Sequence, residues 1–205
     1  MNTYIYIHVC CINNWKEIFG KLLSDIRASG LYDKVTKIRV NILTPMLDLD
    51  VFKDDKIEIL GISNNLRLYE SSTLNLLYQH SFTEDFKVLY LHTKGVKHNG
   101  KNLNVIDWVK YMSYFNIYKH EDCLNMLDNC DAVGVNLFDS PRHFSGNFWW
   151  SSAKHISKLG QCGRDTYNSP EFWVTCVKGE YKSLWKSGVN HYYKRYEEYN
   201  YRFSV

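Results

Sequence analysis

The sequence predicts an α/β fold: one domain with a mixed, mainly parallel sheet flanked by helices. Three observations lead to this fold class. The chain has 205 residues, 45% of them hydrophobic, which is enough for one domain with a sizeable core. Its first 95 residues alternate between short apolar runs and segments with helical spacing, the pattern of a parallel sheet with helical crossovers. It has only 11 Gly and 3 Pro, and no Gly-, Ser- or Pro-rich linker divides it.

The first half of the chain is expected to have the order β-α-β-β-α-β. From Trp15 onward, apolar residues recur three, four and seven positions apart, which predicts an amphipathic helix that ends at Gly30. Leu74 and Leu77 belong to a second helix over residues 70–80. The four strands are apolar and rich in β-branched residues, and they are expected at 4–9, 37–43, 56–62 and 86–91.

The second half of the chain is less regular. One long helix is expected over residues 106–127 and a strand over 132–137. The remaining elements are an aromatic-rich strand or turn at 144–150 and short helices at 152–159 and 170–177. Residues 181–205 form a basic, Tyr-rich tail that we expect to fold over the site.

The charge balance argues against a nucleic-acid partner. The chain has 25 Lys and Arg against 22 Asp and Glu, and the surplus lies in residues 181–205, which hold five basic and two acidic residues. A protein that neutralises a phosphate backbone needs a basic face, which this balance does not supply. The sequence therefore predicts no nucleic-acid binding.

The N-terminal residues and the cysteines predict a cytoplasmic protein, in the host cytoplasm for a viral one. The start lacks a basic segment followed by a long apolar one, and no window of 18 residues is uniformly apolar, so we expect neither a signal peptide nor a membrane span. Six cysteines occur without a Cys-x-x-Cys pair, which favours reduced thiols over a zinc site or a disulfide framework.

The fourth predicted strand ends in the segment VLYLHTKG, residues 88–95. Ligands of open α/β sheets bind beyond the carboxyl ends of the strands, which is where this segment ends. His92 and Lys94 offer hydrogen-bond donors and positive charge to an anion such as a diphosphate, and Gly95 lets the chain turn close to a ligand. The alternative is an ordinary turn with Lys94 in solvent.

Two further motifs, HFSGNFWW (143–150) and SPEFW (169–173), combine aromatic with polar residues. Apolar faces with a few fixed polar groups, here Ser145 to Asn147, suit a sugar or nucleotide, although a packed turn with both tryptophans in the core fits as well. Glu171 lies in the first turn of a predicted helix beside two aromatic residues. It is therefore either a partner of the helix dipole or a general base.

Taken in order, these motifs resemble a known family. The motifs VLYLHTKG, W-x-x-Y-M (from Trp108, in the long predicted helix), DAVGVN, HFSGNFWW and PEFWV occur in this order in small glycosyltransferases of the GT-A fold, from bacteria and from large DNA viruses of algae and amoebae. The sequence is also similar in size and layout to the glycosyltransferase domain of a chlorella-virus enzyme that builds capsid glycans. The resemblance covers residues 4–192.

The resemblance implies a transferase that moves a hexose or deoxyhexose from a nucleotide sugar, with UDP expected, to a glycan hydroxyl, with inversion. Residues 1–95 would bind the nucleotide and residues 96–180 the acceptor. By position, the donor-binding residues would be His8, Cys10, Ser63, Asn64, Asn65, His92, Thr93, Lys94, Gly95 and His191. The acceptor-binding residues would be Asn136, His143, Ser145, Gly146, Asn147, Trp149 and Trp173. Glu171 would be the catalytic base, with Asp139 as the second candidate.

A metal cofactor is not assigned. GT-A enzymes usually place Asp-x-Asp at the end of the fourth strand to hold Mn²⁺, and Mg²⁺ is the other common ion, but His92, Thr93 and Lys94 occupy that place here. A protonated Lys cannot bind a metal, so its charge would itself stabilise the leaving diphosphate. Asp48 and Asp50 form an Asp-x-Asp in a polar loop before the third strand, which favours solvation over metal binding. The alternative function is a non-catalytic glycan- or nucleotide-binding module on the same fold.

Overall fold

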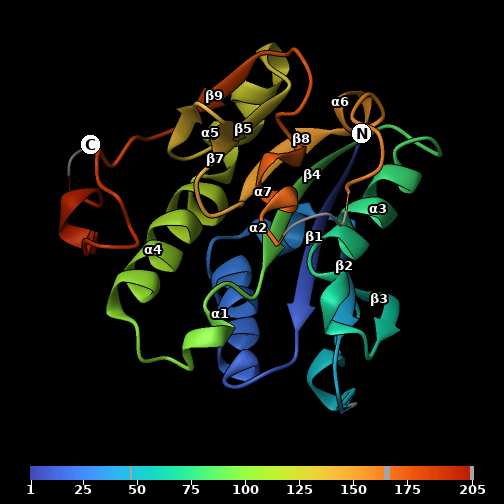
Figure 1. Cartoon of the computed structure of the whole chain (residues 1–205). Helices are drawn as coiled ribbons and strands as arrows, with labels where there is room; N and C mark the ends of the chain where they lie inside the picture. Colours follow the sequence, from blue (N-terminus) through green and yellow to red (C-terminus); the bar gives the residue numbers. More distant parts are fainter. Residues whose placement is uncertain (47, 164–166, 204–205) are drawn as a thin grey trace.

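The computed structural model describes residues 1–46, 48–163 and 167–203, and they form a seven-stranded sheet with helices on both faces (Figure 1). The strand order is β3-β2-β1-β4-β8-β5-β9, and only β8 runs antiparallel to its neighbours. The predicted α/β fold class is therefore confirmed. The strands are β1 (Asn2–Cys10), β2 (Lys37–Leu43), β3 (Ile57–Ser63), β4 (Phe86–His92), β5 (Ala132–Gly134), β8 (Trp149–Ser152) and β9 (Tyr181–Ser183).

The central strand β1 is buried on both sides, and its alternation separates two apolar layers. Ile5, Ile7 and Val9 pack in one layer, with α1 (Trp15–Ala28), α4 (Leu103–Ser113) and α5 (His120–Met126). Tyr4 and Tyr6 point into the other layer, with α3 (Ser71–His80), α6 (Ala153–Ile156) and α7 (Ser169–Trp173). The short α2 (Leu31–Lys34) leads into β2, so the predicted order of the first half is confirmed.

The single long helix predicted over 106–127 is wrong in its middle. A π-helical turn, Tyr114–Tyr118, separates α4 from α5. The side chain of Asn116 donates to the carbonyl of Met112, and the carbonyl of Asn116 accepts the indole N–H of Trp150 at 2.8 Å. Because Trp150 belongs to β8, a contact with the sheet accompanies this local widening of the helix, which the apolar spacing alone does not indicate.

The predicted strand over 132–137 is also interrupted. Asn136 has a φ of +47° and turns the chain out of the sheet, so that β6 (Leu137–Asp139) pairs instead with β7 (Arg142–Phe144) in a separate hairpin. The Asn136 side chain accepts from the Tyr111 hydroxyl and donates to Ser187, which fixes this turn against α4 and the C-terminal segment. α6 and α7 are both shorter than predicted.

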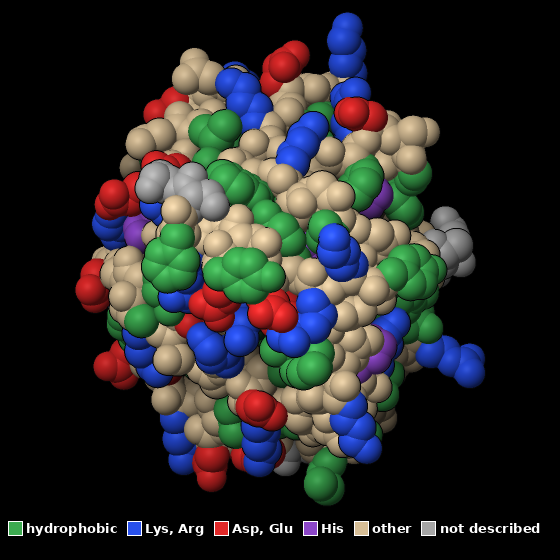
Figure 2. Space-filling model, turned by 90° about the vertical axis from the view of Figure 1, so that its left-hand side faces the viewer, with side chains coloured by type: hydrophobic (Ala, Val, Ile, Leu, Met, Phe, Trp, Pro, Cys, Tyr) green, Lys and Arg blue, Asp and Glu red, His purple; other side chains and the backbone are tan. Residues whose placement is uncertain are grey.

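The C-terminal segment is part of the fold. β9 is an edge strand of the main sheet, Trp185 stacks on Phe115 at 5.4 Å between ring centroids, and Tyr201 is fully buried. The segment is therefore more than the cover of the site that the sequence predicts, because removal of residues 186–203 would take core side chains with it. Acidic and basic side chains alternate over the face that this segment covers (Figure 2). Within the described ranges, no helix has the length and apolar character needed to cross a membrane.

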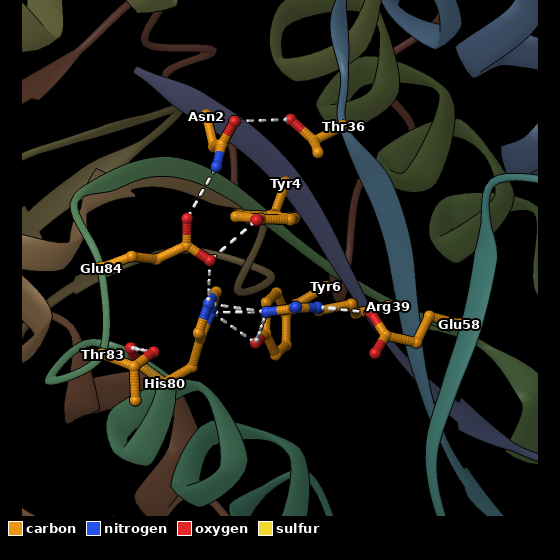
Figure 3. A network of polar contacts seen from close by, with 9 residues as sticks. All are labelled: Asn2, Tyr4, Tyr6, Thr36, Arg39, Glu58, His80, Thr83 and Glu84. Atoms are coloured by element: carbon orange, nitrogen blue, oxygen red, sulfur yellow. Dashed lines mark hydrogen bonds and ion pairs between the residues drawn. The ribbon is translucent and has the colours of Figure 1, made fainter.

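A polar network joins the strands at the end of the sheet where β1 begins (Figure 3). Glu84 accepts from Asn2, Tyr4 and His80, and these hydrogen bonds lower its pKa to about 2. Because a carboxylate only accepts, Nε2 of His80 carries its proton, and Nδ1 accepts from the Tyr6 hydroxyl at 2.9 Å. Arg39 of β2 links this group to β3 through Glu58.

Replacement of Arg39 by Met should destabilise the fold without altering ligand binding. Arg39→Met leaves Glu58, Tyr6 and His80 without the guanidinium at a largely buried position, which should cost about 1–3 kcal/mol in the free energy of unfolding. Urea denaturation measures this, with Lys37→Met on the same strand as the control that should change stability by no more than about 0.5 kcal/mol. Equal losses in both variants would contradict a structural role for the network.

Candidate functional site

A pocket lies where β1 and β4 end, at the carboxyl edge of the sheet. Its volume of about 240 Å³ is somewhat below the usual range for small-molecule sites, so an extended ligand must continue along the open rim. Three kinds of side chain that matter for chemistry line it: the basic Lys94 and Lys97, the carboxylates Glu70 and Glu171, and the aromatic Tyr69, Trp108, Tyr167 and Tyr192. The topology therefore brings cationic, acidic and stacking groups together.

The residues after β4 are held by β1. The Thr93 hydroxyl accepts from the Cys10 N–H at 3.0 Å, and the Thr93 N–H donates to the His8 carbonyl at 3.0 Å. Gly95 follows with a φ of +95°, and a Cβ there would lie 3.0 Å from Val105, so the turn requires glycine. These contacts aim Lys94 into the pocket.

Lys94 has no ion-pair partner among the described residues. Its Nζ lies 4.1 Å from the ring centroid of Trp108, and no described carboxylate lies within ion-pair distance of it. Burial is the main cause that lowers the pKa of Lys94, while Glu171 and Glu70 act in the opposite direction. A half-buried ammonium that faces a pocket without a partner favours an anionic ligand.

His92 and His8 are neutral at pH 7, which corrects the expectation that His92 shares the charge of Lys94. Burial, aided by the nearby Lys94, lowers the pKa of His92 to about 3, and burial lowers that of His8 to about 4. Nε2 of His92 donates to the carbonyl of Gly146 at 3.0 Å, and Nδ1 of His8 is 2.8 Å from the Thr73 hydroxyl. Both histidines therefore contribute hydrogen bonds and no positive charge.

Glu171 lines the pocket from the first turn of α7. Pro170 precedes Glu171 in this turn, and the N–H of Glu171 donates to the carbonyl of Asn168. Both features fix the start of the helix. Within the described residues, its carboxylate forms no hydrogen bond or ion pair. It is thus half-buried and free to act on a ligand in the pocket.

Four residues expected at the donor side do not line the pocket, and Ser63, the last residue of β3, is the first of them. Asn64 and Asn65 are exposed and do not line the pocket, and the Asn65 side chain accepts from the N–H of Arg67 in the loop after β3. His191 is only 2% exposed and stacks on Trp108 and Tyr111, so it lies behind the pocket wall. Its neighbour Tyr192 lines the pocket instead.

None of the residues expected at the acceptor side lines the pocket. They are Asn136, His143, Ser145, Gly146, Asn147, Trp149 and Trp173, and most of them are buried. Gly146 takes a φ of +89° against Trp108 and Met112, where a Cβ would collide. The turn of HFSGNFWW therefore supports the pocket from behind. Asp139 is exposed at the end of β6 and does not line the pocket either.

Sequence reasoning missed several pocket residues. Glu70, Tyr69, Tyr167 and Tyr192 carry no motif, and Trp108 entered only as part of the helix pattern. The loop between β3 and α3 supplies the first two, and α3 packs on β1, the neighbour of β4. The one signal in the sequence that points to Glu70 is its place in a loop that follows a strand and leads into a helix.

The donor set at the end of β4 does not suit a metal ion. His92 uses Nε2 for Gly146, and Lys94 is a cation. Asp48 forms an ion pair with Lys16 and Asp50 one with Lys53, and neither lines the pocket. In the part of the chain that the structure describes, no three His, Cys, Asp or Glu side chains gather in a way that could hold a metal.

Comparisons with known proteins give a family and a fold likeness. No curated protein matches the sequence. Among solved structures, a protein from Desulfovibrio desulfuricans G20 described as a "putative nucleotide-diphospho-sugar transferase" is similar, with 12% identity, a TM-score of 0.46, and coverage of 91% of this chain and 81% of that chain. These figures assign no activity to this chain. A family model described as a domain of unknown function matches residues 35–170, more than half of the chain. The chain therefore belongs to the DUF8361 family.

Proposed function

We propose that this protein is a glycosyltransferase that takes a sugar from a nucleoside diphosphate sugar and transfers it to a hydroxyl of a glycan. The observation that carries the proposal is the ammonium of Lys94, which is half-buried in a pocket at the carboxyl edge of the sheet and has no ion-pair partner in the part of the chain that the structure describes. That edge is where open α/β sheets bind nucleotides. A diphosphate would supply the negative charge that faces Lys94, and Lys97 adds a second ammonium to the pocket lining.

The aromatic rim supports a ring-shaped ligand beyond the phosphates. Tyr69 and Tyr167 meet edge-to-face at 5.2 Å, and Lys97 lies over the Tyr167 ring. Tyr192 and Trp108 stand edge-to-face at 4.9 Å. Such faces stack on bases and sugars, and the donor that we propose is a UDP-sugar.

The proposed chemistry is a single displacement. Glu171 accepts the proton of the acceptor hydroxyl, the hydroxyl oxygen bonds to the anomeric carbon, and the bond from that carbon to the diphosphate breaks with its electron pair leaving on the diphosphate. Lys94 stabilises the charge that develops there, which is the contribution a metal makes in many transferases. No step in this sequence requires a metal.

Binding and turnover test the proposal separately. UDP or a UDP-sugar at a hundred times its dissociation constant should add about 2.7 kcal/mol to the stability, seen as a higher melting temperature with or without Mn²⁺. If no nucleotide or nucleotide sugar shifts the melting temperature, the proposal fails. Binding without hydrolysis or transfer over a panel of glycan acceptors would favour a non-catalytic binding module.

Lys94→Ala should weaken the binding of UDP much more than the binding of uridine. The loss of one charge-assisted contact costs roughly 1.5–3 kcal/mol, and only the diphosphate makes that contact. Isothermal titration of both ligands measures the difference. Lys101→Ala removes an exposed lysine that does not line the pocket, so it should leave both affinities unchanged. Equal losses for UDP and uridine in Lys94→Ala would contradict a phosphate contact.

A further inference from the structure

Glu70 is a second pocket carboxylate, and its two oxygens have different surroundings. Oε2 accepts from the Tyr90 hydroxyl at 2.8 Å and from Nδ2 of Asn147 at 2.7 Å. Oε1 accepts no hydrogen bond within the described part of the chain. Glu70 lines the pocket, and its side chain is 19% exposed. One carboxylate oxygen is thus fixed by the protein, and the other is left for a ligand.

The hydrogen bonds around Glu70 allow only one assignment of donors and acceptors, and this assignment sets its orientation. The indole N–H of Trp149 can only donate, and it donates to Oδ1 of Asn147 at 2.8 Å. The Nδ2 group of Asn147 must then face Glu70. Asn147 is itself buried with a φ of +61°, so the turn of HFSGNFWW holds this amide in place. Glu70 is therefore preorganised rather than free to rotate.

The neighbour of the free oxygen is a second acceptor. Nδ1 of His92 lies 3.4 Å from Oε1 of Glu70. The carbonyl of Gly146 can only accept, so it requires the His92 proton on Nε2, and a neutral ring then has a bare Nδ1. Burial lowers the pKa of His92 to about 3, which keeps the ring neutral at pH 7. Two acceptors thus face each other with no hydrogen between them.

A ligand that meets this pair must bring donors and no negative charge. A phosphate brings only acceptors and would be repelled by the carboxylate, so the diphosphate belongs on the Lys94 side. A sugar with two neighbouring hydroxyls brings two O–H donors, one for Oε1 of Glu70 and one for Nδ1 of His92. Resting on the proposed function, we propose that Glu70 and His92 bind adjacent hydroxyls of the donor sugar, so that the donor is a nucleotide sugar with a vicinal diol.

Hydroxyl deletion in the donor tests this with the wild-type protein. The tightest binder among UDP-, GDP- and dTDP-hexoses serves as the parent, and its deoxy analogues remove one hydroxyl each. Deletion of either of two adjacent hydroxyls should weaken binding by roughly 10- to 100-fold, since a hydrogen bond to a charged group is lost, while the other deletions should have little effect. Equal tolerance of every deletion would overturn the inference.

Glu70→Gln tests the residue itself. Glutamine keeps the shape, and its carbonyl can still accept from Tyr90 and Asn147, but its amino group then occupies the place of Oε1. We expect the parent sugar nucleotide to bind roughly 10- to 100-fold more weakly and the bare nucleoside diphosphate to bind at least as well as before. The penalty for deleting the hydroxyl that faces Glu70 should disappear in this variant.

The outcomes separate the two proposals. If wild-type protein binds no nucleotide, the proposed function fails, and this inference falls with it. If it binds nucleotide sugars but Glu70→Gln retains the full deletion penalty, only the inference fails. Tyr90→Phe, which removes a donor to Oε2 and leaves Oε1 in the pocket, is the matched control and should change sugar affinity far less than Glu70→Gln. A variant that does not fold leaves the wild-type deletion series as the deciding measurement.

Discussion

Glu171→Gln is expected to lower turnover by roughly 10²–10⁴-fold, the usual contribution of a general base, with donor affinity nearly unchanged. The reason is that the substitution keeps the size of the side chain and removes its ability to take a proton. The carboxylate lines the pocket and has no described partner that would hold it for a structural task. Steady-state kinetics on this variant measures turnover, and titration with UDP measures donor affinity.

The competing role for Glu171 is that of a partner of the helix dipole. It predicts the reverse pattern, a loss of about 0.3–1 kcal/mol in stability with near-normal turnover. Asp139→Asn is the matched control, because Asp139 is the other carboxylate that the sequence proposes as a base and it is exposed outside the pocket. We expect its turnover to stay at the wild-type level. If both variants remain active, the inverting mechanism should be withdrawn.

The protein should lose stability steeply as the pH falls from about 6.5 to about 4. Burial lowers the pKa of His8 and of His191 to about 4 and that of His92 to about 3, whereas a histidine in the unfolded chain titrates near 6.5. The positive charge of Lys94 also lowers the pKa of His92 and of His191. The negative charge of Glu70 raises the pKa of His8, but burial has the larger effect there. In this pH window the unfolded state binds more protons than the folded state, so the free energy of unfolding decreases as the pH falls.

The size of this effect is large compared with the stability of a domain. Each histidine contributes about 1.4 kcal/mol per pH unit while it is protonated only in the unfolded state, so three together approach about 4 kcal/mol per unit. A domain has about 5–15 kcal/mol in all. Urea denaturation at a series of pH values measures how the free energy of unfolding changes with pH. His8→Gln removes one of the three titrating groups, so it should reduce this slope by up to about 1.4 kcal/mol per pH unit. A flat profile between pH 6.5 and 5 would contradict neutral buried rings.

The sequence by itself determined the first four strands of the sheet and the β4 turn. Strands and helices of the first half follow from local patterns, because a period of two or of 3.6 depends only on neighbouring residues. HTKG could be placed at a strand end for the same reason, and the structure does put His92 to Gly95 at the pocket. Two of the errors in the second half, at Asn116 and Asn136, arise where a side-chain hydrogen bond ties the chain to a distant element and the local pattern is not followed.

Only the tertiary structure decided which residues meet at the pocket. Glu70 reaches His92 because it directly precedes α3, which packs on β1, the neighbour of β4, and Glu171 arrives from a helix about 80 residues further along the chain than β4. HFSGNFWW was expected to contact the ligand, yet its aromatic rings fill the core and its polar atoms hold Glu70 and His92. The same local pattern, a polar residue beside aromatic ones, occurs both in a pocket wall and in the layer behind that wall. The direction in which each side chain points depends on the packing of the whole sheet, which no short segment encodes.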